Sequence, residues 1–209
     1  MTAIIDYGAG NLRSVQKAFE HLGEQAVITR DRDAILSADA AVLPGVGAFG
    51  DAMDSLNRRE LAPVIREFIA TGKPFLGICL GLQLLFDESE ESPGVQGLGI
   101  LRGTVRRFPK EIGLKIPHIG FNSIRKSPSC PLFAGLPDEP YYYFVHSYYC
   151  RCDDRAASAA ETEYGIRFDS AVQQGNLFAV QFHPEKSGTV GLRTLQNFIG
   201  LVGDSRKGE

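Results

Sequence analysis

The sequence predicts an α/β fold: one domain with a mostly parallel central sheet, helices on both faces and a strand-rich second half. Short buried strands alternate with amphipathic helices over residues 1–86, an order typical of parallel sheets that are covered on both faces. After residue 86 short β-like segments replace the helical pattern. No repeat or linker divides the chain, so we expect a single domain over 1–209.

The first unit reads as a strand, a glycine turn and a helix. Residues 3–6 read as a short buried strand, and Asn11 is placed to cap a helix whose apolar residues share one face and which ends near Gly23. A dinucleotide-binding turn would need a glycine where Arg13 stands, so the turn does not fit that motif.

Two more strands are predicted over 25–29 and 40–43, the second of which stops at Pro44. The loop 44–50 holds three glycines. It is either a flexible turn or a place where backbone N–H groups come close to a ligand, as an oxyanion hole requires. Apolar spacing then predicts an amphipathic helix over 61–69.

The stretch 74–86 reads as a buried strand that runs into a helix. Gly77, Cys79 and Gly81 form a G-x-C-x-G pattern, the thiol counterpart of the nucleophile elbow. Glycines leave room for a strained turn, and the helix N–H groups and dipole favour a thiolate, with the N–H of Leu80 as an oxyanion donor. A lone cysteine is more often a buried apolar residue, so this interpretation needs a partner base.

The second half is read as strands over 104–108, 117–124, 141–152 and 177–182, followed by an amphipathic helix over 189–202. Both the loop 44–50 and the cysteine turn would lie at the carboxyl ends of parallel strands, where such sheets bind ligands.

His183 and Glu185 supply a candidate base and its orienting group. They stand two residues apart at the end of an apolar strand, so in an extended chain both side chains face the same side, and the proline between them favours that geometry. The carboxylate can then hold the imidazole in one tautomer. We interpret His21 and His118 as surface or core residues, and His146 stays open.

Composition restricts the class of protein. The net charge is −3 and no basic run occurs, which argues against nucleic acid and anionic membrane surfaces as partners. No apolar segment reaches the ~20 residues of a membrane span, and no signal-peptide pattern precedes the first strand, so we expect a cytoplasmic protein. The spacing of Cys79, Cys130, Cys150 and Cys152 suits neither a metal site nor a disulfide framework, and we expect no metal or cofactor.

These motifs resemble the class I, triad-type glutamine amidotransferases. The likeness rests on G-I-C-L-G at 77–81 with Gln83, and on H-P-E at 183–185. The segments 6–12, 44–47 and 143–148 look like one branch of that family, whose members are subunits of an enzyme of histidine biosynthesis. The resemblance spans nearly the whole chain and implies the family's flavodoxin-like fold.

The resemblance implies that Cys79 attacks the side-chain amide of L-glutamine, while His183 moves the proton and Glu185 orients it. A thioester and free ammonia would result. The residues implied for the oxyanion and for glutamine are Gly45, Val46, Gly47, Leu80, Gln83, Ser147 and Tyr148.

The implied partner is a (β/α)8-barrel cyclase that forms a heterodimer with this chain and receives ammonia through an internal channel. Residues implied at the interface or the ammonia path are Asn11, Tyr143, His146 and Lys186. Phe121 stands where the family pattern has tryptophan, which affects interface packing and not the triad. Two alternatives remain: a glutaminase of pyridoxal phosphate or purine synthesis, and a catalytically silent binding module of this fold.

Overall fold

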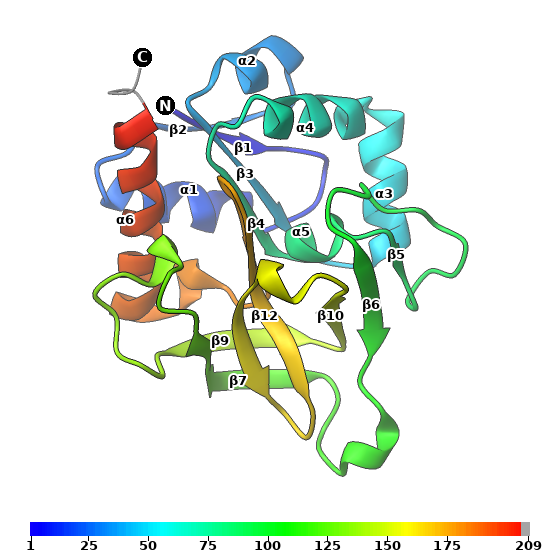
Figure 1. Ribbon diagram of the computed structural model, residues 1–209. Helices are drawn as coiled ribbons and strands as arrows, with labels where there is room; N and C mark the ends of the chain where they lie inside the picture. Colours follow the sequence, from blue (N-terminus) through cyan, green and yellow to red (C-terminus); the bar gives the residue numbers. More distant parts are fainter. Residues whose placement is uncertain (206–209) are drawn as a thin grey trace.

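Strands and helices alternate along the first half of the chain, as predicted (Figure 1). The computed structural model describes residues 1–205. The elements of this half are β1 (Thr2–Ile5), α1 (Leu12–His21), β2 (Ala26–Thr29), α2 (Arg32–Ser37), β3 (Ala40–Gly45), α3 (Phe49–Arg58), α4 (Leu61–Ala70), β4 (Phe75–Cys79), α5 (Leu80–Gln83) and β5 (Glu88–Ser89).

The second half is rich in strands, also as predicted. Its elements are β6 (Gly103–Arg107), η1 (Lys110–Ile112), β7 (His118–Ser123), β8 (Arg125–Lys126), η2 (Pro131–Phe133), β9 (Tyr141–His146), β10 (Tyr148–Cys152), η3 (Arg155–Ala157), β11 (Ser158–Glu163), β12 (Arg167–Gln174), β13 (Leu177–Val180), η4 (Pro184–Lys186) and α6 (Gly188–Ser205).

Parallel strands form the centre of the sheet. β2, β1, β3, β4 and β13 lie side by side in that order and all run parallel. Beyond β13 the sheet continues through β12, β10 and β6 in antiparallel pairs, while β7 and β9 form a separate antiparallel pair. The predicted central parallel sheet is confirmed, and the second half extends it.

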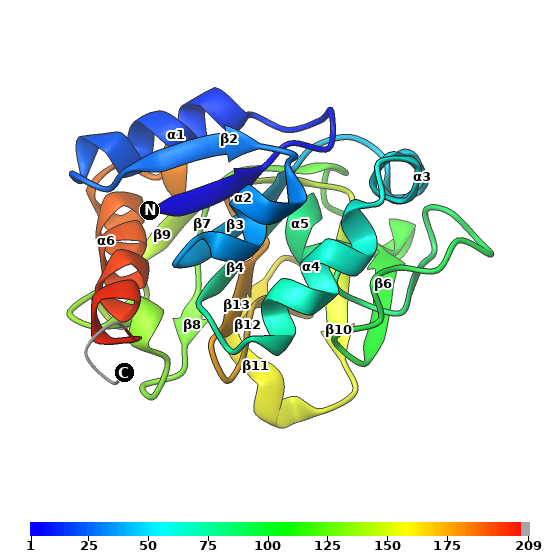
Figure 2. The same cartoon turned by 90° about the horizontal axis from the view of Figure 1, so that it is seen from above.

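Helices cover both faces of the parallel strands, as predicted (Figure 2). α1 and α6 lie on one face, where the rings of Phe19 and Phe198 meet edge to face at 6.2 Å. α2, α3 and α4 lie on the other, where Phe68 packs near Phe75 at 6.4 Å. Each such fully buried ring contributes roughly 1.5–3 kcal/mol, so the two faces hold the parallel strands in place.

Helix α1 begins where predicted, but Asn11 does not cap it with its side chain. The backbone carbonyl of Asn11 accepts hydrogen bonds from the N–H groups of Ser14 and Val15 at 3.1 and 3.2 Å. The predicted side-chain cap is therefore wrong, because the main chain of Asn11 provides the acceptor.

Strand β3 passes through Pro44 instead of stopping there. Pro44 is in register with Ile78, and Gly45 with Cys79. Proline removes only one ladder donor, so the parallel pairing continues and places Gly45 directly beside the elbow cysteine.

The helix predicted after Cys79 is a single turn, since α5 ends at Gln83. The carbonyls of Leu84 and Leu85 accept instead from the N–H groups of Leu98 and Ile100 at 2.8 and 2.9 Å. The apolar pattern at these leucines therefore reflects their burial in the core and not the continuation of a helix. The helix dipole that acts on Cys79 is thus that of a single helical turn.

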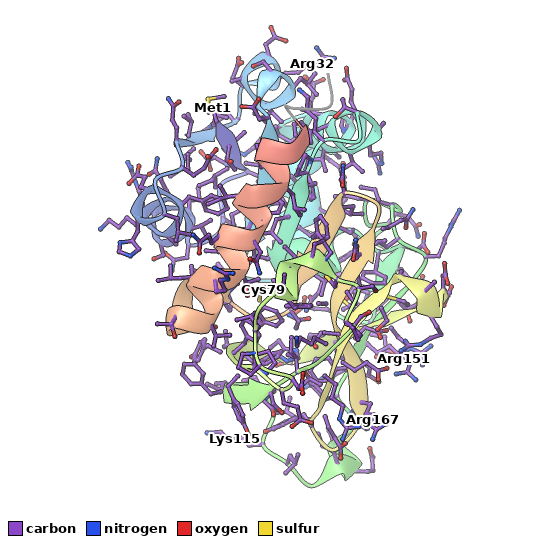
Figure 3. All side chains as sticks on the ribbon, turned by 60° about the vertical axis from the view of Figure 1, so that its left-hand side comes forward. Met1, Arg32, Cys79, Lys115, Arg151 and Arg167 are labelled. Carbon is purple, nitrogen blue, oxygen red and sulfur yellow. The ribbon has the colours of Figure 1, made fainter. Side chains whose placement is uncertain are left out.

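The segment 141–152, read as one β region, is two strands that break at Ser147 and belong to different sheets. Figure 3 shows where the strands carry Cys79: it lies in the middle of the molecule, between the end with Met1 and Arg32 and the end with Lys115 and Arg167. No helix of the described residues is long and apolar enough to cross a membrane. The last four residues of the domain expected over 1–209 lie outside the described part.

Candidate active site

Cys79 occupies a sharp turn between β4 and α5. Its φ of 56° and ψ of −110° are values that L-residues rarely adopt. A Cβ at Gly81 would lie 1.8 Å from the carbonyl oxygen of Leu43, and a Cβ at Gly77 would lie 2.9 Å from the Cβ of Ala179 and from the carbonyl oxygen of Gly81. The turn therefore fits between its neighbours only with both glycines, which is the elbow that the motif predicts.

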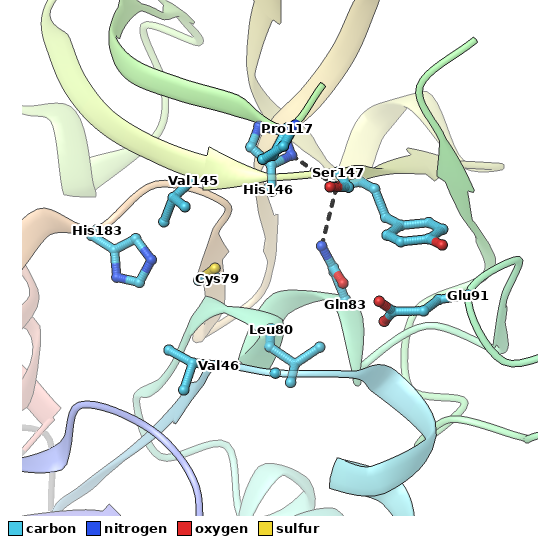
Figure 4. Close-up of a pocket in the computed structure, with 12 residues that line it drawn as sticks. Val46, Cys79, Leu80, Gln83, Glu91, Pro117, Val145, His146, Ser147 and His183 are labelled. Atoms are coloured by element: carbon cyan, nitrogen blue, oxygen red, sulfur yellow. Dashed lines mark hydrogen bonds between the residues drawn. The ribbon is translucent and has the colours of Figure 1, made fainter. Parts of the chain in front are cut away.

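A cavity of about 340 Å³ opens at the carboxyl ends of β3 and β4 (Figure 4). Cys79 lies in its wall with 7% of its surface exposed. The residues that line the cavity are Val46, Gly47, Cys79, Leu80, Gln83, Glu91, Pro117, Val145, His146, Ser147, Tyr148 and His183. Most of the predicted site residues thus meet here, and Gly45 lies beneath them, paired with Cys79.

His183 and Glu185 form a buried pair, with His183 Nδ1 and Glu185 Oε1 2.8 Å apart. The extended backbone assumed for them is wrong, because β13 ends at Val180 and a 3-10 turn, η4, follows His183. The side chains meet because this turn folds the carboxylate back to the ring. His183 itself keeps the extended conformation that the following proline favours.

The surroundings of His183 favour its charged form. Burial on its own lowers the pKa of this imidazole, but the nearby Cys79 sulfur and the Glu185 carboxylate outweigh burial and raise the pKa to about 9. Because Nδ1 faces the carboxylate, Nε2 is the nitrogen left without a hydrogen-bond partner within residues 1–205. Figure 4 shows this ring beside the sulfur, so Nε2 is the atom placed to exchange a proton.

Gln181 is a site residue that sequence reasoning missed. This fully buried side chain donates from Nε2 to the Cys79 sulfur at 3.7 Å and accepts at Oε1 from Gln83 Nε2 at 3.0 Å. Gln83 Nε2 also donates to the carbonyl of Tyr148 at 3.2 Å. The one available signal was a polar residue between Val180 and Phe182, inside an otherwise apolar run.

Glu91 is a second residue that was missed. Its carboxylate stands in the cavity wall (Figure 4) and also accepts from the N–H of Phe49 at 2.7 Å, at the start of α3. This contact fixes an acidic group on the side of the cavity away from His183, where a cationic group of a ligand can bind.

The predicted interface residues lie in different settings. Asn11 precedes α1, and Lys186 is exposed on η4 with its Nζ 5.8 Å from the centre of the Tyr143 ring. His146 differs from these, because it is only 6% exposed and faces the cavity. In this structure His146 belongs to the cavity wall and not to the outer surface.

All four cysteines are free thiols, and Cys150 and Cys152 face the same core from β10. Within the described part of the chain, no cluster of three or more His, Cys, Asp or Glu side chains is suited to hold a metal ion.

An elbow cysteine, a carboxylate-bound imidazole and a cavity at the carboxyl edge of a parallel sheet define a protein built for nucleophilic attack by a thiolate. The family described as "Glutamine amidotransferase class-I" matches residues 3–201, and the chain belongs to this family. The resemblance predicted from the motifs is confirmed.

Curated relatives refine this result. The chain is 48% identical to "Imidazole glycerol phosphate synthase subunit HisH" of Bacillus cereus (strain G9842) over 97% of this chain and 95% of that protein. It is 48% identical to the HisH subunit of Methanocaldococcus jannaschii (97% and 100% covered) and 53% identical to that of Thermosynechococcus vestitus (97% and 97% covered). The branch indicated by the motifs is thereby supported over 97% of the chain.

Solved structures agree on the fold. One described as "Crystal structure of glutamine amidotransferase" superimposes with a TM-score of 0.75 at 21% identity, covering 96% of this chain and 98% of the other. "Structure of PurLQS from Thermotoga maritima" gives 0.74 at 18% identity, covering 95% and 97%. At these identities the likeness establishes the fold alone.

Proposed function

We propose that this chain is the glutaminase subunit of imidazole glycerol phosphate synthase and hydrolyses L-glutamine to L-glutamate and ammonia. The observation that carries the proposal is that Cys79 and His183 lie in the wall of one cavity, with the buried Glu185 carboxylate bound to the His183 ring behind it. Identities of 48% and more to HisH subunits over nearly the full length support the same reaction.

In the first step the Cys79 thiolate attacks the side-chain amide carbon of glutamine. A C–S bond forms, and the electron pair of the C=O bond moves to the oxygen. The N–H groups of Leu80 and of the stretch 45–47 lie at this edge of the sheet and would bind the oxyanion. Each such donor typically contributes ~3 kcal/mol to transition-state stabilisation.

In the second step the His183 imidazolium protonates the amide nitrogen from Nε2. The C–N bond breaks, ammonia leaves, and a glutamyl thioester remains on Cys79. Water then adds to the thioester while His183 takes its proton, and cleavage of the C–S bond releases glutamate and restores the thiolate. The Glu185 carboxylate stabilises the imidazolium at each stage where it forms.

The other end of the cavity suits the α-ammonium group of glutamine. Both Nε2 hydrogens of Gln83 are taken by Gln181 and Tyr148, so its Oε1 is the atom that remains for a ligand. Together with the Glu91 carboxylate it offers acceptors to a cation. We propose Ser147 and Tyr148, which also line the cavity, as the further glutamine contacts.

We propose a (β/α)8-barrel cyclase as the partner in a heterodimer. The cyclase would join the ammonia to a phosphorylated nucleotide and form imidazole glycerol phosphate and aminoimidazole carboxamide ribonucleotide, in the cytoplasmic synthesis of L-histidine. On this assignment the whole chain, 1–209, acts as one amidotransferase domain.

Exposed apolar side chains on β7 and β9 support a docking surface beside the cavity. Ile119, Phe121 and Tyr141 are 54%, 61% and 59% exposed. The Phe121 ring packs at 5.7 Å on that of Tyr143, so the replacement of the family's tryptophan keeps an aromatic contact there. The N–H of His183 donates to the carbonyl of Tyr143 at 2.9 Å, which connects this surface to the base.

Covalent labelling tests the proposed chemistry. An electrophilic analogue of glutamine should label the chain stoichiometrically at Cys79, and excess glutamine should protect it. The matched control, Cys130→Ala, removes a buried thiol outside the site and should label like the parent. Absence of labelling in both proteins would favour the silent binding module, and co-purification with a different synthase would favour another pathway.

A further inference from the structure

Two buried histidines stand beside the cavity and take no part in the proposed chemistry. His118 Nδ1 and His146 Nε2 are 3.0 Å apart, and the side chains are 3% and 6% exposed. His146 lies in the cavity wall (Figure 4), while His118 is stacked on the rings of Phe144 and Tyr164 at 4.9 and 4.0 Å. For two imidazole nitrogens to form a hydrogen bond, one must carry a hydrogen and the other must be without one.

The contact between His146 and the backbone of Tyr148 determines which nitrogen of His146 carries the hydrogen. Its Nδ1 is 2.8 Å from the carbonyl oxygen of Tyr148, which can only accept, so this nitrogen carries the hydrogen. Burial lowers the pKa of His146 to about 3, and the neighbouring His118 and His183 rings also oppose a charge on it. A neutral ring with a hydrogen on Nδ1 has a bare Nε2, which must accept from His118.

The contacts of His118 indicate the same direction for the hydrogen bond between the two rings, with His118 as the donor. Burial lowers the pKa of His118 to about 4, so this ring is neutral too and its one hydrogen lies on Nδ1, facing His146. Its bare Nε2 is 3.4 Å from Asn122 Nδ2, a donor. The Asn122 amide cannot be reversed, because Nδ2 donates to the carbonyl of Glu163 and Oδ1 accepts from the N–H of Ser123.

The chain of hydrogen bonds therefore has one direction, from Asn122 through His118 and His146 to the carbonyl of Tyr148. That carbonyl is also the acceptor for Gln83 Nε2, at 3.2 Å. Gln83 presents its Oε1 to the cavity only while its Nε2 stays bound to the Tyr148 carbonyl. The histidine pair thus connects the outer part of β7 to the wall proposed to bind glutamine.

We propose that His118 and His146 are positioning residues for glutamine binding: their directional hydrogen bonds hold the Tyr148 carbonyl, and through it Gln83, where the ligand needs them. The identity of the ligand rests on the proposed function. The hydrogen positions on the two rings do not depend on the proposed function, because they follow from contacts within the chain alone.

Nitrogen-15 NMR of the histidine side chains in the full chain tests the hydrogen positions independently of any activity. At pH 7 we expect both His118 and His146 as neutral rings with the hydrogen on Nδ1, the tautomer less common in free histidine. His21, exposed on α1, serves as the internal reference. A hydrogen on Nε2, or a charge, on either ring would overturn the proposal.

Kinetics of His118→Phe then tests the positioning role. Phenylalanine keeps the stack on Phe144 and Tyr164 but leaves His146 Nε2 a buried acceptor without a donor. With the partner present, we expect the KM for glutamine to rise roughly tenfold while kcat falls less than about threefold. The rate at which iodoacetamide alkylates Cys79 should not change, because this small reagent does not need the glutamine site.

Two further variants separate positioning from packing. His118→Asn restores an N–H donor near the place of Nδ1 and should recover most of the lost affinity. Tyr164→Phe changes the same stack but removes only a hydroxyl that bonds the carbonyl of Lys115, so its KM should equal that of the parent. An unchanged KM in folded His118→Phe contradicts the positioning role, whereas absence of glutamine turnover in the parent would contradict the proposed function instead.

Discussion

The side-chain amide of Gln181 donates a hydrogen bond to the sulfur of Cys79 over 3.7 Å. Gln83 holds the other end of this amide at 3.0 Å, so the donor stays directed at the sulfur. His183 lies beside the same sulfur (Figure 4). A thiolate at Cys79 therefore has a hydrogen-bond donor and a cation beside it, and both stabilise its charge.

Replacing Gln181 with methionine keeps the volume and removes the donor. A hydrogen bond to a charged group is worth about 1.5–3 kcal/mol, so Gln181→Met should lower kcat/KM roughly tenfold to a hundredfold. The rate of Cys79 alkylation at a fixed pH should fall with it. Gln196→Met, at an exposed position of α6, is the control and should match the parent. Equal alkylation rates in both variants would refute this role of Gln181.

The pKa of His183 predicts how stability changes with pH. Because the pKa is raised from 6.5 to about 9 on folding, the folded chain binds this proton more tightly than the unfolded chain. The stabilisation, on the order of 3 kcal/mol, is complete below about pH 6.5 and is lost as the pH rises through about 9. Denaturant unfolding of the parent and of His183→Gln should show a difference that shrinks across this range. A difference that does not depend on pH would contradict the prediction.

Glu185→Gln keeps the shape of the side chain and removes the charge that stabilises the imidazolium. The pKa of His183 should fall, and kcat for glutamine should drop on the order of 10³-fold with little change in KM. Steady-state glutamate release and a histidine titration by NMR check both parts. Glu111→Gln, an exposed residue of η1, should leave both quantities as they are. Retention of kcat in Glu185→Gln would show that the carboxylate does not orient the base.

Glycines at two positions should respond to alanine in opposite ways. At Gly81 a Cβ would lie 1.8 Å from the Leu43 carbonyl, so Gly81→Ala should lower the free energy of unfolding by about 3 kcal/mol or more. At Gly200, inside α6, no heavy atom lies within 4 Å of the added Cβ. Alanine there should raise stability by about 0.5–1 kcal/mol, because it favours the helix. Thermal unfolding of both variants measures the contrast.

The sequence predicted those parts of the site whose contacts are local. Cys79 stands between two glycines that the turn itself requires, and His183 meets Glu185 across a single residue, so short spacing determines each contact. The hydrogen bond from Gln181 to Cys79 joins residues 102 positions apart. Such a contact exists only once β13 pairs with β4, and no local pattern marks it.

The helices and strands that the sequence did not predict were missed for similar reasons. The predicted glycine-rich loop 44–50 covers the first two residues of α3, and no element was predicted over 51–58. The residues of β11 contain one β-branched side chain, Thr162, and form a strand because β12 and β8 pair with them on either side. In both places tertiary pairing or packing decides a conformation that local propensity does not favour.

The most direct test of the central claim is glutamate release from glutamine by the purified chain, alone and with the cyclase subunit and its nucleotide ligand, with Cys79→Ala in parallel. We expect low activity for the chain alone, a marked increase in the full mixture, and no activity in the variant. Unchanged turnover in Cys79→Ala would contradict the thioester mechanism. Turnover that the cyclase does not alter would contradict the assignment to imidazole glycerol phosphate synthase.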